Sequence, residues 1–349
     1  MRPLGRDSAS TLPHRTPSGL VSQLDIDDVG LLSRLSAGLE AAEKGLQEAA
    51  TDAEDPRVAQ LAGHLAASGG KRLRPLLVLL GAEFGEPWRA GVVEAAVVAE
   101  LVHVSTLYHD DVMDAAVTRH GVPSANARWG ERSAVLGGDL LLARAARLSA
   151  ALGPEAIRAN AQAADHLVAG QFRELVGPAP DEDPVDHYFE VLAGKTAALL
   201  AMSLSIGAHQ AGVDAPSTRA LEEFGRELGI AFQIADDLLD LTAPVGRTGK
   251  EQGKDLAAGV ASLPVLLARA DDRPSGAELR ELLDSDLVAE PVARRRALEL
   301  FQTSPALAAA EAVMNERLTR ARAAIRGLKP YAAHRALESL CGFVATRAA

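Results

Sequence analysis

The chain has 349 residues, 48% of them hydrophobic, and a formal net charge of −11 at pH 7. It is long enough to bury a large core, and its acidic surface repels a phosphate backbone, which argues against nucleic acid as a partner. The single cysteine, Cys341, excludes a disulfide framework within the chain and fits a cytoplasmic location.

The N-terminal segment is rich in proline, serine, threonine and glycine, and it lacks the apolar stretch of a secretory signal. We therefore predict a disordered tail over residues 1–22, followed by one large domain over residues 23–349. No apolar run is long enough to span a bilayer without a charge. We expect no transmembrane segment, and at most peripheral membrane contact.

The remainder of the sequence indicates helices. Alanine and leucine dominate, and aromatic residues make up only 3%, a composition that favours helices over strands. Apolar residues recur at spacings of three and four over the ranges Val29–Leu46, Val92–Val112, Ala134–Leu152, Leu221–Leu241 and Ala306–Leu328. Glycine and proline clusters separate these stretches. The pattern predicts an all-α fold built as a single large helical bundle.

Two acidic motifs follow long apolar stretches. The first, DDVMD, runs from Asp110 to Asp114, and the second, DDLLD, runs from Asp236 to Asp240. On a helix, the first and last aspartates of each motif share one face, about 6 Å apart along the axis, where like charges repel. Mg²⁺ would offset this repulsion, because it commonly bridges carboxylates to substrate phosphates. One such run alone is better explained as a solvated helix end, whereas two predict a metal–diphosphate site.

Isolated cations accompany the acidic motifs. Lys71 and Arg74 lie in the string GGKRLRP at a predicted helix start, where the helix dipole favours an anion. Lys195 interrupts an apolar run in the string GKT, and Lys250 and Lys254 lie in a loop that can close over a diphosphate. Each has a simpler explanation, as a helix cap, a snorkelling lysine or an ordinary polar loop. The combination predicts diphosphate binding through Mg²⁺.

Together these motifs resemble those of the trans-isoprenyl diphosphate synthases. The matching strings, in the family's order, are GGKRLRP (69–75), LVHVSTLYHDDVMD (101–114), GKT (194–196), FQIADDLLD (232–240) and GKEQGKDL (249–256). The resemblance covers about residues 25–345. It implies a large all-α bundle around a central cavity, usually a homodimer.

The resemblance also implies roles for individual residues. The expected ligands of isopentenyl diphosphate are Lys71, Arg74 and His103. Those of the allylic diphosphate are Arg119, Lys195 and Lys250. The expected metal ligands are Asp110, Asp111 and Asp114 with Asp236, Asp237 and Asp240, of which Asp237 is the least direct. Thr196 and Gln233 are expected to line the reacting centre, and Gln171 and Glu174 are weaker candidates.

Two positions depart from the family pattern. His120 stands where the family usually has a second arginine that helps to hold isopentenyl diphosphate, and histidine can replace it only when protonated. Val260 stands where the family often has a lysine. Both departures weaken phosphate binding and leave open a catalytically weak regulatory subunit.

The implied reaction is a head-to-tail condensation by ionisation, condensation and elimination. Three Mg²⁺ ions are expected to hold the allylic diphosphate between the acidic motifs, with Lys195 and Arg119 adding fixed positive charge. No side-chain base is obvious, so the departing diphosphate is the expected proton acceptor. A terpene cyclase of the same fold is an alternative, although it would use a single acidic motif with a different second metal site.

Product length is expected to depend on the residues one helical turn before the first motif. Ser105 and Thr106 occupy these positions, where short-chain family members often carry aromatic residues. Small side chains leave a deeper tunnel, so we predict a product longer than farnesyl, from geranylgeranyl to long-chain polyprenyl diphosphate. Leu148, on the next helix, is the expected floor. The alternative is that Ser105 and Thr106 are only small packing residues.

Overall fold

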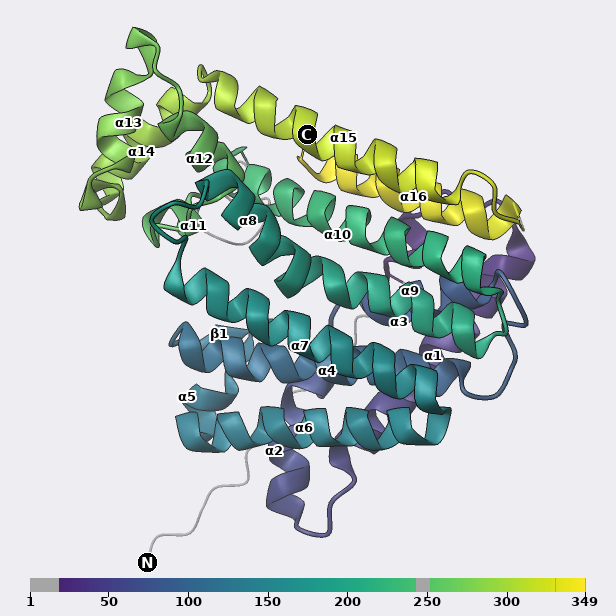
Figure 1. Ribbon diagram of the computed structural model, residues 1–349. Coiled ribbons are helices and arrows are strands. Elements are labelled where there is room, and N and C mark those ends of the chain that lie inside the picture. Colours follow the sequence, from purple (N-terminus) through teal and green to yellow (C-terminus); the bar gives the residue numbers. More distant parts are fainter. Residues whose placement is uncertain (1–18, 243–251, 330, 349) are drawn as a thin grey trace, which may run out of the picture.

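The computed structural model describes residues 19–242, 252–329 and 331–348. Within these ranges the chain is almost entirely helical (Figure 1), so the all-α prediction is confirmed. The elements are η2 (Val21–Gln23), α1 (Val29–Thr51), α2 (Pro56–Ala67), α3 (Leu73–Ala82), α4 (Val92–Met113), β1 (Thr118–Arg119), β2 (Val122–Pro123), α5 (Ala125–Trp129), α6 (Glu131–Leu152), α7 (Pro154–Val176), α8 (Pro184–Leu192), the π-helix η3 (Ala193–Ala197), α9 (Ala198–Gln210), α10 (Ala215–Thr242), α11 (Lys254–Ala257), α12 (Leu263–Arg269), η4 (Pro274–Gly276), α13 (Ala277–Leu283), η5 (Asp286–Ala289), α14 (Pro291–Phe301), α15 (Pro305–Ile325) and α16 (Tyr331–Ala348).

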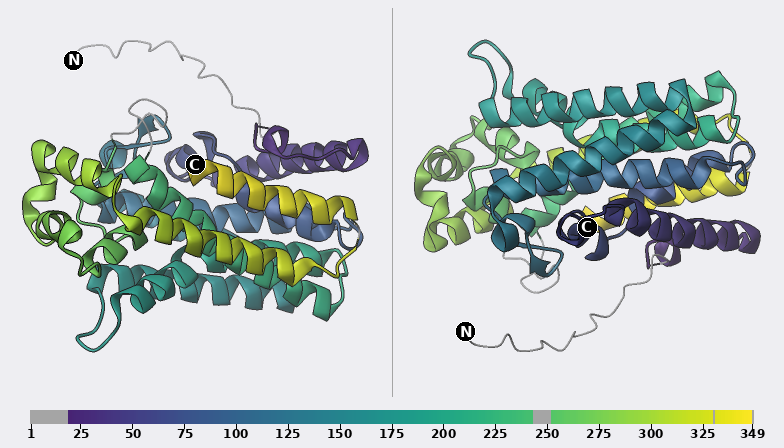
Figure 2. Two further views of the ribbon diagram at one scale, coloured as in Figure 1. Left: turned by 90° about the horizontal axis from the view of Figure 1, so that it is seen from above. Right: turned by 90° about the horizontal axis from the view of Figure 1, so that it is seen from below.

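The long helices form one bundle around two hydrophobic clusters. One cluster packs α1, α3, α9, α10, α15 and α16 together, and the other packs α2, α4, α6, α7 and part of α9. A third, smaller cluster holds α11 to α14 as a lobe beside one end of the bundle (Figure 1). The views along the vertical axis show this lobe displaced to one side of the long helices (Figure 2).

Close backbone contacts fix the middle of the bundle. A Cβ atom on Gly207 of α9 would lie 2.0 Å from the carbonyl oxygen of Val78 in α3, and one on Gly81 would lie 2.3 Å from that of Leu204. Only glycine allows two helices to approach this closely. The crossing of α3 and α9 therefore depends on Gly81 and Gly207.

The predicted N-terminal tail needs a correction at its end. Residues 1–18 lie outside the described residues, and for them the tail stays a prediction. Leu20 and Val21, however, are buried in the first hydrophobic cluster, and Val21 begins the short helix η2. The polar composition of the segment concealed these two apolar anchors.

Two helical stretches in the described residues are long and apolar enough to cross a membrane, Val92–Met113 and Pro184–Gln210. Most of each stretch is buried inside the bundle, 67% and 72% of its most apolar window. Such burial is the property of a core helix, because a membrane-spanning helix that faces lipid would leave its apolar side chains on the protein surface.

Candidate active site

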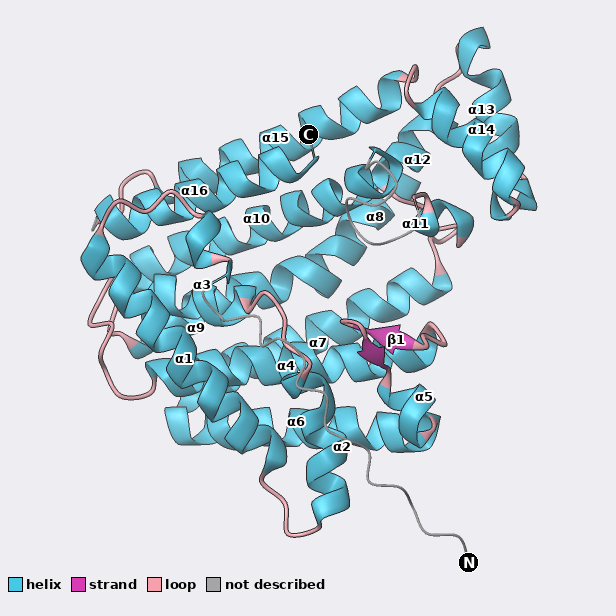
Figure 3. Cartoon of the chain, turned by 180° about the vertical axis from the view of Figure 1, so that it is seen from behind, coloured by secondary structure: helices cyan, strands magenta, loops and turns pink. Residues whose placement is uncertain are grey.

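The two acidic motifs lie at the same end of the bundle. The first ends α4 and the second ends α10, and these helix ends lie beside the β1–β2 hairpin and α11 (Figure 3). Arg74, at the start of α3, lies between them. Its NH1 is 3.4 Å from His103 Nε2 on α4. Burial lowers the pKa of Arg74, and the negative charges of Glu100 and of Asp236 on α10 oppose that fall.

In the first motif, Asp111 is held by Arg119. The buried Oδ1 of Asp111 accepts hydrogen bonds from Arg119 Nε at 2.8 Å and NH2 at 2.5 Å. Its other oxygen, Oδ2, is buried and accepts no hydrogen bond within the described ranges. Burial raises the pKa of Asp110, and the charge of Lys195 opposes that rise. Asp114 caps the helix and is exposed.

The hairpin fixes the position of Arg119 and His120. Strands β1 and β2 pair Arg119 with Val122, which leaves His120 and Gly121 as a two-residue turn with φ values of 52° and 81°. Positive φ at both turn residues is the requirement of a type I′ hairpin. The ring of His120 lies 3.3 Å, through Nδ1, from Ser68 Oγ, next to the GGKRLRP segment.

The aspartates of the second motif have different surroundings. Asp236 Oδ1 lies 2.9 Å from Arg347 NH2 of the last helix, without the alignment of a hydrogen bond, so the contact is Coulombic. Asp240 accepts from the backbone N–H groups of Lys254 and Asp255 at 3.1 and 3.2 Å. Burial raises the pKa of Asp240, and the charge of Asp255 adds to the rise.

Asp237 is turned toward other partners. Its Oδ2 accepts from Tyr188 Oη at 2.7 Å and from Leu263 N–H at 3.4 Å, and its Oδ1 accepts from Gln233 Nε2 at 3.4 Å. Burial raises its pKa to about 7. These bonds direct the carboxylate toward α8 and α12, while the role of Asp237 as a metal ligand stays a prediction.

Lys195 reaches the site through an irregular helix. It lies in the π-helix η3, and such π-bulges occur frequently at functional sites. The helix crosses α7 so closely that a Cβ on Gly170 would lie 2.6 Å from the backbone nitrogen of Lys195. Lys195 Nζ then pairs with Glu174 Oε2 at 2.5 Å, and Gln171 donates to the same oxygen at 3.1 Å.

A short hydrogen-bonded chain joins the π-helix to α10. Thr196 Oγ1 donates to Gln233 Oε1 at 3.3 Å, and Gln233 Nε2 donates onward to Asp237. The chain therefore runs from Thr196 to Tyr188 through two residues of the FQIADDLLD string. It brings together both residues that were expected at the reacting centre.

The cations of the GGKRLRP segment lie on another side of the site. Lys71 is exposed, with Nζ 5.9 Å from the ring centre of Phe343. His103 is neutral, because burial and the positive charges of Arg74, His120, Arg72 and Arg119 hold its pKa well below its usual value. Because a guanidinium only donates, a neutral His103 accepts from Arg74 through its unprotonated Nε2 and adds no second charge.

The remaining predicted residues are placed as follows. Lys250 lies outside the described residues. Ser105 is buried and donates to Val102 O at 2.6 Å, and Thr106 donates to His103 O at 2.8 Å. Leu148 of α6 is partly buried against the second hydrophobic cluster. The role of these side chains in product length stays a prediction.

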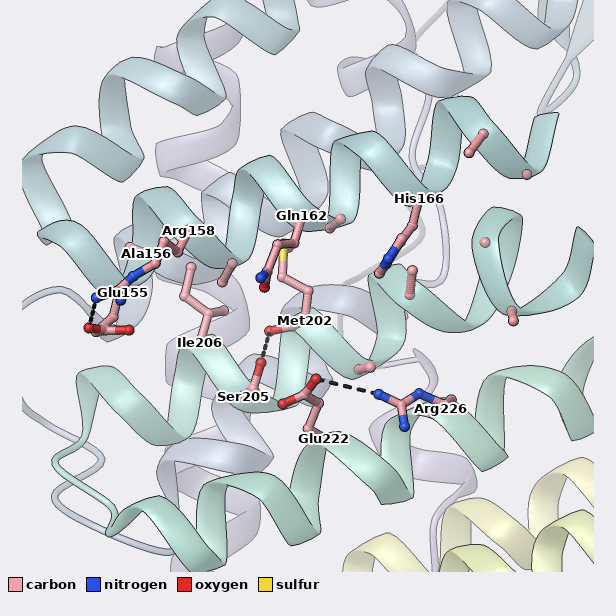
Figure 4. A pocket seen from close by; sticks show the side chains of 18 of the residues that line it. Glu155, Ala156, Arg158, Gln162, His166, Met202, Ser205, Ile206, Glu222 and Arg226 are labelled. Carbon is pink, nitrogen blue, oxygen red and sulfur yellow. Dashed lines mark hydrogen bonds and ion pairs between the residues drawn. The ribbon is translucent and has the colours of Figure 1, made fainter. Parts of the chain in front are cut away.

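A groove of about 550 Å³ lies elsewhere, between α7, α9 and α10 (Figure 4). Its lining includes the ion pairs Glu155–Arg158 and Glu222–Arg226, and none of the motif aspartates. The groove is therefore separate from the motif aspartates, and the central cavity that the resemblance implies stays a prediction.

The donor set fits a hard divalent cation. Carboxylate oxygens are the protein ligands that Mg²⁺ prefers, and the buried Oδ2 of Asp111 is free to accept one. In the described part of the chain, no three His, Cys, Asp or Glu side chains already surround one point. A metal held here would therefore take part of its coordination from substrate oxygens or water, as Mg²⁺ commonly does.

Three residues at the site were not expected from the sequence: Arg72, Tyr188 and Arg347. Tyr188 and Arg347 lie far along the chain from the carboxylates that they contact, so spacing gave no signal for either. Arg72 lies inside the GGKRLRP string, but nothing in that string separates a buried arginine from a ligand-facing one.

Comparisons with known proteins identify the family of the chain. A family model described as polyprenyl synthetase matches residues 55–300. The nonaprenyl diphosphate synthase of Mycobacterium tuberculosis is 38% identical over 334 residues, which cover 95% of this chain and 99% of that protein. A geranylgeranyl diphosphate synthase of the same organism is 39% identical over 267 residues, 74% of this chain and 76% of that protein.

The fold is similar to that of a crystal structure of geranylgeranyl pyrophosphate synthase from Corynebacterium glutamicum, complexed with calcium and isoprenyl diphosphate. The TM-score is 0.84 at 38% identity, covering 93% of this chain and 99% of that one.

Proposed function

The chain belongs to the polyprenyl synthetase family and is a prenyltransferase of the trans-isoprenyl diphosphate synthase type, and from this premise we propose its reaction. We propose that it condenses isopentenyl diphosphate with an allylic diphosphate, head to tail. The observation that carries the proposal is the meeting of two acidic motifs at one end of the bundle, among cations from α3, β1 and the π-helix.

Mg²⁺, three ions per site, is the proposed cofactor, and when bound it neutralises charge on the leaving diphosphate. The proposed ligands are Asp110, Asp111 and Asp114 with Asp236 and Asp240. The relative from Corynebacterium glutamicum, complexed with calcium and isoprenyl diphosphate, supports a divalent metal at such a site.

The side chains of this chain bind and orient the two substrates. Lys195 and Arg119 add fixed positive charge where the allylic diphosphate leaves, which favours the transition state over the ground state. Lys71 and Arg74 hold isopentenyl diphosphate, with neutral His103 behind Arg74. The apolar helix walls keep water from the allylic cation.

We further propose a product longer than farnesyl. Ser105 and Thr106 are small side chains one helical turn before the first motif on α4. The hydroxyl of Ser105 donates to the backbone carbonyl of Val102 on the same helix. Relatives named as nonaprenyl and geranylgeranyl diphosphate synthases support this range.

A homodimer is proposed from the surface of α6 and α7. These neighbouring helices expose a set of large apolar side chains, each between 63% and 75% exposed: Leu136, Val168, Phe172, Leu175 and Val176. Such a patch favours a protein interface. Light scattering should give twice the chain mass for the wild type and a smaller mass for Phe172→Glu.

We also propose a cytoplasmic location, with peripheral membrane contact at product release.

The test is product analysis by mass spectrometry. The protein is incubated with Mg²⁺, isopentenyl diphosphate and allylic primers of increasing length, and with each primer alone. Elongation that needs both substrates supports the proposal. Turnover of the primer alone would indicate a terpene cyclase, and failure to release diphosphate with any primer would indicate a regulatory subunit.

A further inference from the structure

Arg72 lies between Lys71 and Arg74, yet its surroundings differ from theirs. Its side chain is only 5% exposed. Its Nε donates to Glu43 Oε2 at 2.6 Å, NH1 donates to Glu100 Oε1 at 3.0 Å, and NH2 donates to Glu43 Oε1 at 3.0 Å and Ala66 O at 2.7 Å. A guanidinium has five N–H donors. With four protein contacts and almost no exposure, Arg72 is not available to a diphosphate.

These contacts join three helices at the start of a fourth. Glu43 belongs to α1, Ala66 to α2 and Glu100 to α4, while Arg72 is the N-cap residue of α3. Glu100 precedes His103 by one helical turn on α4. The same guanidinium therefore connects the helix that carries His103 with the segment that carries Lys71 and Arg74.

The backbone of Arg72 is left-handed, with φ 51° and ψ 38°. Residues other than glycine rarely adopt this conformation, because their Cβ comes too close to the following carbonyl oxygen. In the described part of the chain only two other non-glycine residues have positive φ, and each directly follows a predicted site residue: Ala115 after Asp114, and His120 after Arg119. Such strain persists where the surroundings determine it, and it concentrates at functional sites.

The left-handed turn determines where the two flanking cations point. The left-handed residue separates the two cations: Lys71 before it is exposed near the Phe343 ring, whereas Arg74 after it contacts His103. The buried anchor therefore fixes the relative orientation of both cations.

We propose that Arg72 is a positioning residue for the isopentenyl diphosphate site. Its ion pairs with Glu43 and Glu100 hold the strained turn that directs Lys71 and Arg74 at one diphosphate. This inference rests on the proposed function, since it assigns these two cations to that substrate. It predicts a selective effect, because Arg119 and Lys195, on the allylic side, have their own partners.

The chain offers a matched control at the other end of α3. Arg34 of α1 forms a two-contact ion pair with Glu83, the C-cap residue of α3, at 2.8 and 2.7 Å. Glu83 is buried, and the pair joins the same two helices as Arg72 and Glu43. Arg34→Lys removes the bidentate hydrogen bonding to Glu83 and does not alter the segment from Lys71 to Arg74.

The experiment compares Arg72→Lys, Glu43→Gln and Arg34→Lys with the wild type. Lysine keeps the charge of Arg72 but cannot make its planar contacts. We expect Arg72→Lys to raise the KM for isopentenyl diphosphate about ten- to a hundredfold, the scale of a charged hydrogen bond, with the KM for the allylic primer changed less than about twofold. Glu43→Gln should also raise the KM for isopentenyl diphosphate, by a smaller factor than Arg72→Lys.

Each outcome decides something. The positioning role would be overturned if Arg72→Lys changed both KM values equally. It would also be overturned if Arg72→Lys changed neither KM value and, like Arg34→Lys, only lowered the unfolding temperature. If Arg72→Lys does not fold, the half-buried Glu43→Gln decides, and an unchanged KM for isopentenyl diphosphate in that variant overturns the proposal. A wild type that does not condense the two substrates refutes the proposed function instead, which separates the two failures.

Discussion

The contact between Arg347 and Asp236 predicts that the last helix competes with metal for the second motif. The two charges lie 2.9 Å apart, with side chains 22% and 33% exposed, and the Arg347 guanidinium lies 4.8 Å from the ring centre of Phe232. Replacement by methionine, Arg347→Met, keeps an unbranched side chain and removes the charge. In the metal-free protein, the carboxylate then loses the positive charge of Arg347.

The size of the effect follows from exposure. Both side chains are partly exposed, so solvent screens the pair. A screened ion pair contributes about 0.2–1 kcal/mol, and a cation over an aromatic ring about 0.5–1 kcal/mol more. We therefore expect Arg347→Met to lower the free energy of unfolding without metal by about 1 kcal/mol. Because the positive charge of Arg347 lies 2.9 Å from Asp236 Oδ1 and repels a cation bound at this carboxylate, the same change should tighten the apparent Mg²⁺ affinity about fivefold.

The assay is a Mg²⁺ titration followed by thermal unfolding, with inorganic pyrophosphate present. Arg335→Met is the matched control, because Arg335 lies on the same helix, is 58% exposed and pairs with Asp27 at 3.6 Å, away from the motifs. We expect the control to leave Mg²⁺ affinity unchanged. A weaker or unaltered Mg²⁺ affinity in Arg347→Met would refute the competition.

Three further predictions concern the charges and the walls of the site. Lys195→Ala should lower kcat by about a hundredfold or more, since Lys195 is expected to stabilise the leaving diphosphate, while Glu174→Gln should lower it far less, as single-turnover kinetics would show. His103→Gln should flatten the pH dependence of stability below about pH 6.5, because unfolded His103 takes up a proton there and the half-buried ring of the folded protein does not. As the pH is lowered, the free energy of unfolding of the wild type, measured in urea, should fall by up to about 1.4 kcal/mol per pH unit more than that of the variant. Ser105→Phe should shorten the product, and an unchanged product distribution by mass would refute the tunnel assignment.

The sequence predicts the helices and the motif residues because both depend on local information. Apolar spacings of three and four persist through α4 and α10, and each acidic motif is contiguous. The departures from the family pattern at His120 and Val260 can also be read directly from the sequence. The structure places His120 in a hairpin turn with positive φ.

The pairing of charges could not be predicted, because it depends on contacts between distant parts of the chain. The ion pair between Arg119 and Asp111, and the hydrogen bonds that Tyr188 and Leu263 donate to Asp237, have no signal in the spacing of the sequence. The roles of Arg119 and Asp237 in binding substrate and metal stay predictions. The burial of Leu20 and Val21 was hidden for the same reason. A helix that begins hundreds of residues later supplies part of the surface on which they pack.

The two sides of the site differ in how their charges are balanced before substrate arrives. On the side expected to bind the allylic diphosphate, each described cation already has a carboxylate: Arg119 has Asp111 and Lys195 has Glu174. A substrate arriving there with metal exchanges partners, since metal takes the carboxylates and the released cations take the diphosphate. On the other side Arg74 faces a neutral His103, and its buried Nε donates no hydrogen bond within the described ranges. Arg74 Nε can therefore donate to a phosphate oxygen without losing a hydrogen bond, so we expect the removal of metal to change the KM for the allylic primer more than the KM for isopentenyl diphosphate.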